Sequence, residues 1–192
     1  MKEWFVSELQ ESLVTSVHDM QMTLDYLDTR GDLDMNRVGM FGQRSGGTIA
    51  ILSASVDPRI KAVDLIDPWA DWPDWLAKSP LIPEGERPTY LTPAFLSKIA
   101  WLDPIRSLAQ VKPRPLRLQE NLFNAAMPEE VRNRLEAVLP ANALIIEYHS
   151  VEEYGEKVNS NAKMLDWLQA QLHSSTVKIS TTQVKEPGME QH

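Results

Sequence analysis

The sequence predicts an α/β fold, a mostly parallel sheet of about four strands flanked by helices. Short apolar runs with the length of buried strands alternate with segments whose apolar residues recur every three or four positions. The first two such runs and the helical segment between them fit within about thirty residues, the size of a βαβ unit. Of the 192 residues, 43% are hydrophobic and 24% charged, so we expect one globular domain with its own core.

The first element is an amphipathic helix at 13–27, because its apolar residues repeat at helical spacing. Gly31 follows it, and glycine readily adopts the left-handed conformation that ends helices. The later elements are expected in this order: a strand at 37–41, a helix at 48–55, a strand at 61–66, a short strand at 116–119, a helix at 128–139, a strand at 143–148 and a helix at 157–172.

The segment from about 68 to 115 differs from the rest in composition. It holds many of the 13 prolines and four of the six tryptophans, and its periodicity is weak. We therefore expect an irregular or short-helical, cap-like insertion within a domain spanning 1–172. The remaining residues, 173–192, are polar and have no face to bury, which is typical of a disordered tail.

The run GQRSGGT at 42–48 carries the most specific signal in the chain. It follows a predicted strand and precedes an apolar helix, and it is similar to the nucleophile elbow of the α/β-hydrolases, normally G-x-S-x-G-G. The elbow needs glycines because its nucleophile lies at a strained positive φ, where bulky neighbours collide with the backbone. Without gaps, the resemblance places Arg44 at the nucleophile position. The elbow glycines are Gly42, Gly46 and Gly47.

A second register makes Ser45 the nucleophile. The first glycine of the motif then falls on Gln43, and the strand shifts by one residue, which turns its side chains to the opposite faces.

The resemblance extends over 13–172 and is closest to esterase, dienelactone-hydrolase and prolyl-oligopeptidase-like members of the superfamily. It implies a triad acid in the loop after the strand at 116–119, at the position held here by Asn124. An amide does not stabilise an imidazolium as a carboxylate does. The family's histidine belongs a few residues after the last strand, where this chain has Glu152 or Glu153. His149 lies earlier, at the strand end, and is the alternative base.

Members of this superfamily carry about a hundred residues before the elbow, including four strands and a loop that donates to the oxyanion; that donor is worth about 3 kcal/mol. This chain begins at the helix before the nucleophile strand. The resemblance therefore implies that this strand is an exposed edge, through which a second copy or a complementing chain would complete the sheet.

Charge and composition exclude several function classes. The net charge of -8 disfavours nucleic acid and anionic membranes, and the absence of cysteine excludes disulfides and thiolate chemistry. We expect no cofactor. We also expect no metal site, because the aspartates at 64, 67, 71 and 74 lack the glycine-assisted spacing of a cation loop. With no signal peptide or membrane-spanning run, the expected location is the cytoplasm.

Three hypotheses follow for function. The first is a degenerate hydrolase-fold protein without serine-hydrolase activity. The second is an active esterase or peptidase that uses Ser45 with His149 and an acid such as Glu152, completed by a partner chain. The third is an anion-binding module that presents Arg44 to a carboxylate or phosphate.

Overall fold

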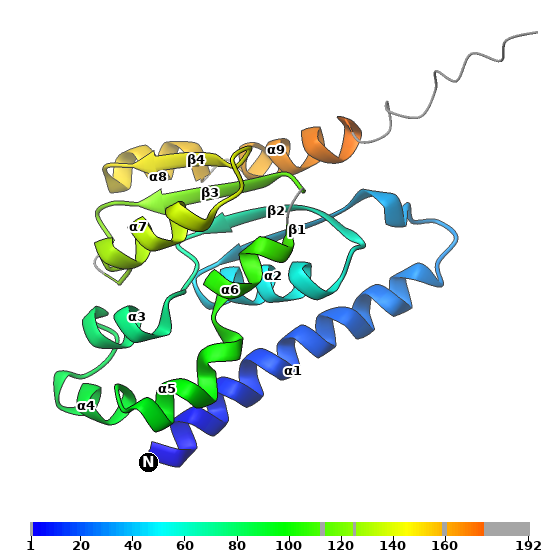
Figure 1. Cartoon of the computed structure of the whole chain (residues 1–192). Helices are drawn as coiled ribbons and strands as arrows, with labels where there is room; N and C mark the ends of the chain where they lie inside the picture. Colours follow the sequence, from blue (N-terminus) through cyan, green and yellow to red (C-terminus); the bar gives the residue numbers. More distant parts are fainter. Residues whose placement is uncertain (1, 112–113, 125, 159–160, 175–192) are drawn as a thin grey trace, which may run out of the picture.

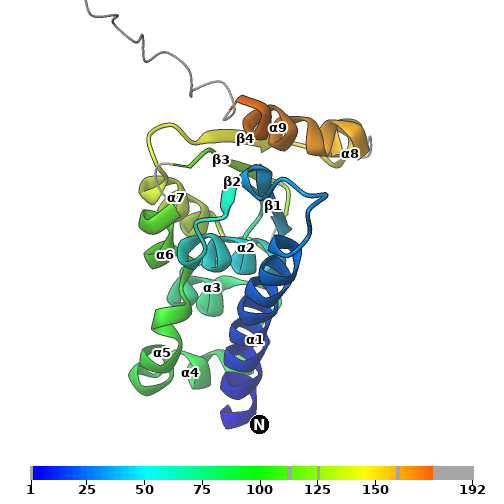
Figure 2. The same ribbon diagram turned by 90° about the vertical axis from the view of Figure 1, so that its right-hand side faces the viewer.

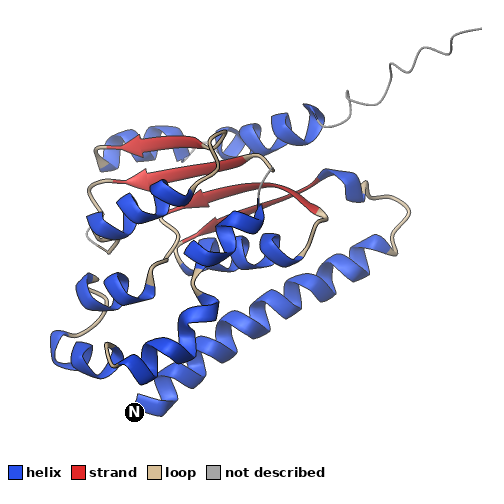
Figure 3. Cartoon of the chain, in the orientation of Figure 1, coloured by secondary structure: helices blue, strands red, loops and turns tan. Residues whose placement is uncertain are grey.

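A four-stranded, fully parallel sheet forms the centre of the molecule, in the order β1-β2-β3-β4 (Figure 1, Figure 3). The computed structural model describes residues 2–111, 114–124, 126–158 and 161–174. This architecture confirms the predicted fold class. The strands are β1 at Val38–Gln43, β2 at Ile60–Ile66, β3 at Leu116–Asn121 and β4 at Leu144–Tyr148.

Helices cover both faces of the sheet, as a parallel sheet requires. In Figure 2, α2, α6 and α7 lie on one face and α8 and α9 on the other, while α1 packs against α2. The helices are α1 at Lys2–Asp28, α2 at Ser45–Val56, α3 at Trp72–Lys78, α4 at Arg87–Tyr90, α5 at Pro93–Ile99, α6 at Pro104–Val111, α7 at Glu129–Val138, α8 at Val151–Val158 and α9 at Asn161–Ser174.

Several elements differ in extent from the expectation. The first helix is longer than 13–27, and the single helix expected at 157–172 is represented by α8 and α9. The segment expected to be a cap-like insertion contains the helices α3 to α6. Most of the expected polar tail, residues 175–192, lies outside the described residues. No helix in the described part of the chain has the length and apolar content to cross a membrane.

The two central strands are almost completely buried, and β2 carries a charged residue at its middle. Asp64 is register-paired with Arg117 of β3, whose guanidinium donates to both carboxylate oxygens at 2.8 and 2.6 Å. Gln119 donates to the same carboxylate and accepts a hydrogen bond from the Tyr148 hydroxyl of β4. These bonds satisfy the charges that the sheet and α9 remove from water.

β1 lies at one edge of the sheet and pairs only with β2 among the strands that the structure describes. β4 forms the other edge. The carboxyl end of β1, next to β2, is where the glycine-rich run begins, and the candidate site is built there.

Candidate functional site

The glycine-rich run forms a sharp turn between β1 and α2, and Arg44 is the residue at its apex. β1 ends at Gln43 and α2 begins at Ser45. Arg44 between them has φ 52 and ψ -121, a conformation that residues other than glycine rarely adopt. Its N–H donates to the Ile66 carbonyl at 2.9 Å, and its carbonyl accepts from the Thr48 N–H at 3.1 Å. The backbone of Arg44 is therefore fixed by both β2 and α2.

Two glycines make the turn sterically possible. A Cβ on Gly42 would lie 2.3 Å from the Gly46 carbonyl oxygen, and one on Gly47 would lie 2.8 Å from the Pro68 Cβ. Gly46, expected from the motif to be required, has open space at its Cβ position. The need for glycine comes instead from the close approach of the first turn of α2 to β1 and to the segment after β2.

The turn borders a hollow of about 230 Å³ at the carboxyl ends of β1 and β3. The side chains of Gln43 and Arg44 are exposed here. The Gln43 amide donates to the Tyr154 hydroxyl at 3.3 Å, which joins the end of β1 to α8. The hollow is lined by Gln43, Arg44, Asn121, Phe123, Asn124 and Tyr154.

Asn124, at the position implied for the triad acid, does line this hollow, but its amide is engaged in fixing the loop. Its Nδ2 donates to the Asp67 carboxylate at 3.1 Å, and its Oδ1 accepts from the Ala126 N–H at 3.0 Å. Asp67 is 1% exposed, has φ 43 and also accepts two hydrogen bonds from Asn121. The only acid in this network is thus a buried carboxylate held by amides.

The positions considered for the triad histidine lie outside the hollow. β4 is followed at once by α8, and Glu152 is an exposed residue of its first turn. Glu153 caps the helix: its N–H donates to the Ser150 hydroxyl at 3.1 Å, and its carboxylate accepts from the His149 N–H at 2.9 Å. Both the His149 N–H and Lys157 hold the pKa of Glu153 below its usual value.

His149 and Ser45 do not meet in the described structure. The His149 side chain is 69% exposed and has its Nε2 4.0 Å from Glu147. Ser45 is the first residue of α2 and does not line the hollow. Arg44 and Asn124 therefore both line the hollow, whereas Ser45, His149 and Glu152 do not.

Tyr154, Phe123 and Asn121 line the hollow and were not identified from the sequence. The signal for Tyr154 is the S-x-x-E pattern at 150–153, which predicts a helix start after β4 in place of a loop. Because α8 begins at Val151, Tyr154 lies about one helical turn after Ser150, the residue that precedes the helix.

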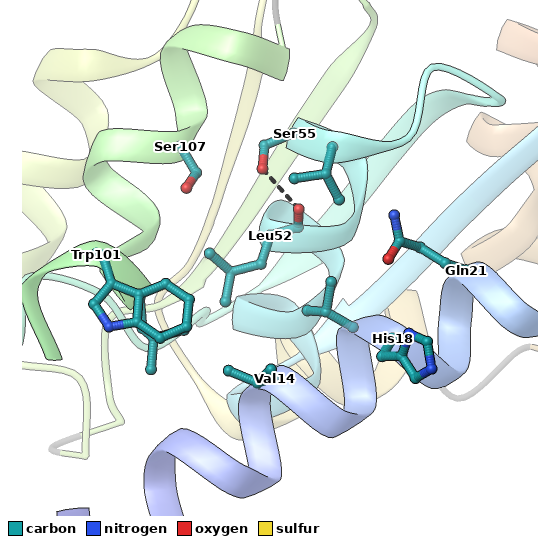
Figure 4. A pocket seen from close by; sticks show the side chains of 10 residues that line it. Val14, His18, Gln21, Leu52, Ser55, Trp101 and Ser107 are labelled. Carbon is teal, nitrogen blue, oxygen red and sulfur yellow. Dashed lines mark hydrogen bonds between the residues drawn. The ribbon is translucent and has the colours of Figure 1, made fainter.

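A second hollow, of about 410 Å³, lies between α1, α2, α6 and the segment before α6 (Figure 4). Its walls are mostly apolar, and Figure 4 shows His18 and Ser107 on opposite sides of it. The Ser55 hydroxyl donates to the Leu52 carbonyl at 2.7 Å and is not directed at a base. This hollow has no arrangement for nucleophilic catalysis among the residues that line it.

No protein-family model matches the chain. Solved structures with similar folds include acetyl xylan esterase 1 from Thermoanaerobacterium sp. JW/SL YS485, at 17% identity and a TM-score of 0.61, with 78% of this chain covering 51% of that one. The 2,6-dihydroxy-pseudo-oxynicotine hydrolase has 18% identity and a TM-score of 0.63, with coverages of 83% and 47%. The Pyrococcus horikoshii acylaminoacyl peptidase has 18% identity and a TM-score of 0.62, with coverages of 93% and 30%. The chain thus spans about half the length of the first two.

Proposed function

We propose that this chain, which has the α/β-hydrolase fold, is without serine-hydrolase activity and binds a small anionic ligand at the former nucleophile position. The observation that carries the proposal is Arg44 at φ 52, at the apex of the turn between β1 and α2. The fold holds a residue in this strained conformation to present its side chain above the carboxyl ends of the strands. Here the presented group is a guanidinium.

A guanidinium does not serve as the nucleophile of acyl transfer, because it stays protonated and has no acceptor lone pair. The other two triad positions support the same interpretation. Asn124 donates to Asp67 in place of accepting from a histidine, and the chain enters α8 where the histidine loop would lie. The three positions that correspond to nucleophile, acid and base therefore hold Arg44, Asn124 and an exposed glutamate of α8.

The same geometry favours anion binding. Arg44 is exposed, forms no ion pair within the described part of the chain, and precedes the N-terminus of the 12-residue helix α2. The N-terminus of a helix carries a partial positive charge, and a guanidinium binds a carboxylate through two parallel hydrogen bonds. Gln43, Asn121 and Tyr154 add polar groups around the hollow.

The size of the hollow limits the ligand. A volume of about 230 Å³ corresponds to roughly eight water molecules at about 30 Å³ each. The exposed ring of Phe123 beside Tyr154, with centroids 6.4 Å apart, gives an aromatic wall. We therefore expect small carboxylates, including aromatic ones such as benzoate, to bind in preference to large substrates.

The proposal is tested by thermal unfolding and calorimetric titration with acetate, succinate, benzoate and phosphate. We expect at least one of these anions to stabilise the wild-type protein and Arg106→Ala, in which an exposed arginine of α6 is removed. The same anion should lose its effect in Arg44→Ala and retain part of it in Arg44→Lys. Stabilisation that is unchanged in Arg44→Ala would place the anion elsewhere and refute the proposed site.

The absence of hydrolase activity is tested separately, with short-chain p-nitrophenyl esters and a fluorophosphonate probe. We expect neither turnover nor labelling in the wild-type protein, and no activity in Arg44→Ser. Labelling that disappears in Ser45→Ala and persists in Arg44→Ala would establish Ser45 as a nucleophile and overturn the proposal.

We also propose that the outer edge of β1 pairs with a second copy of the chain. The edge of a parallel sheet offers unpaired backbone N–H and C=O groups, which is a template for another strand. β1 has one strand neighbour in the part of the chain that is described. Light scattering over a range of protein concentrations should show a dimer; a monomer at every concentration would refute self-pairing and leave only a different complementing chain.

A further inference from the structure

Three glutamate side chains converge on the face of the sheet covered by α7, away from the Asp64 and Arg117 pair on the opposite face. They come from three elements: Glu120 from β3, Glu136 from α7 and Glu147 from β4. One carboxylate oxygen from each lies within 4.8 Å of the others. Figure 1 shows the ribbon of α7 next to β3.

The strand register brings two of the three carboxylates together. Glu120 and Glu147 are direct partners in the parallel pairing of β3 with β4, so their side chains project from the same face of the sheet. Like charges at paired positions destabilise a sheet. α7 adds a third carboxylate at the same place, which increases the repulsion unless a cation or a proton compensates it.

Glu120 is the buried member of this cluster. It is 1% exposed, and neither of its carboxylate oxygens has a hydrogen-bond donor among the described residues. The carboxyl of Glu136 lies next to it. Burial, followed by the influence of Glu136, raises the pKa of Glu120 above its usual value, and Arg132 opposes this shift. A buried carboxyl without a donor is energetically costly, so it points to a ligand that supplies positive charge.

We propose that Glu120, Glu136 and Glu147 bind a hard divalent cation of the size of Ca²⁺. Carboxylate oxygens are the ligands that Ca²⁺ prefers, at distances of about 2.3–2.6 Å. Three oxygens within 4.8 Å of one another surround an ion of that size with only small side-chain movements. Mg²⁺ needs about 2.0–2.1 Å and a stricter octahedron, so it fits this spacing less well.

The surroundings of the cluster leave the ion accessible. The Glu147 side chain is 49% exposed, which provides an entry path and room for water ligands. The Arg132 guanidinium donates to the Met127 carbonyl. The cation site is separate from the hollow at Arg44 and does not depend on the anion-binding proposal.

The full chain, freed of metal with a chelator, provides the test. Adding CaCl2 up to about 10 mM should raise the Tm by roughly 5–10 °C at about 100 times the Kd, and calorimetry should show one site per chain. We expect a smaller shift with MgCl2. Without metal, Glu120→Gln should be at least as stable as the wild type, because it removes a buried, unpartnered carboxyl.

Matched variants distinguish a site from general screening of the acidic chain. Glu129→Gln, which changes an exposed glutamate on the same helix as Glu136, should keep the full calcium shift. Glu120→Gln and Glu136→Gln should each lose it. No shift in the wild type, as expected if Glu120 and Glu136 only share a proton, overturns the proposal; equal shifts in all variants also overturn it.

Discussion

The backbone of Arg44 has a conformation that favours glycine, although the residue is an arginine. Its φ of 52 and ψ of -121 cost a non-glycine residue about 1–3 kcal/mol. Glycine avoids this strain, but it loses more conformational entropy on folding than alanine does, which offsets about 0.5–1 kcal/mol of the gain in stability. Arg44→Gly should therefore be about 1 kcal/mol more stable than Arg44→Ala, and the Tm should differ by about 2–4 °C.

Arg44→Gly is compared with Arg44→Ala and not with the wild type, because both variants remove the same exposed side chain and differ only in the backbone preference of the new residue. Thermal unfolding followed by circular dichroism measures the difference. Ser45 supplies the control: it is the first residue of α2, so Ser45→Gly should be less stable than Ser45→Ala. Equal stability of Arg44→Gly and Arg44→Ala would refute the strain at this position. If Ser45→Gly were instead more stable than Ser45→Ala, the result would favour the register of the elbow that has Ser45 at its apex.

Three further predictions concern stability. Gly47→Ala, whose Cβ would lie 2.8 Å from a proline ring, should lower the free energy of unfolding by about 1–3 kcal/mol, while Gly46→Ala, with open space, should not; denaturant titration of both measures this. Asp64→Ala should destabilise by about 3–5 kcal/mol, because it removes the carboxylate that the buried Arg117 guanidinium donates to; wild-type stability in urea would contradict the role of this pair. Burial raises the pKa of Asp71 to about 6, above its unfolded value of about 3.9, so the charged form opposes folding increasingly as the pH rises between these values. The free energy of unfolding of Asp71→Asn relative to the wild type should therefore rise by up to about 2 kcal/mol from pH 4 to 7. A difference between the two proteins that does not change with pH would show that the pKa of this carboxyl is not perturbed.

The position of the elbow was predictable from the sequence because its determinants are local. A strand followed by closely spaced glycines and an apolar helix specifies the turn, and Gly42 meets the backbone of a residue only four positions away. The role of Gly47 was less visible, since its constraint comes from Pro68 after the next strand. Sequence spacing does not reveal such a contact.

Counting along the chain was less informative for the third triad position. It pointed to Glu152 because it assumed a loop after the last strand, as in the family. The Ser150 and Glu153 cap begins a helix there, and the helix turns Glu152 to solvent and brings Tyr154 to the hollow. The difference is one of local geometry: residues in a helix advance about 1.5 Å each and change direction by about 100°, which a loop count ignores.

By itself, the sequence determined the four strands, their order, the parallel α/β class and the presence of Arg44 at the turn after β1. These depend on the periodicity of apolar residues and on short glycine spacings, both of which act between near neighbours. Only the tertiary structure decided that Asn124 binds the buried Asp67, that Tyr154 joins the hollow, and that Glu120 faces Glu136 and Glu147. Those juxtapositions arise from the register between strands and the placement of α7 and α8 on the sheet, which bring together residues that are distant in the chain.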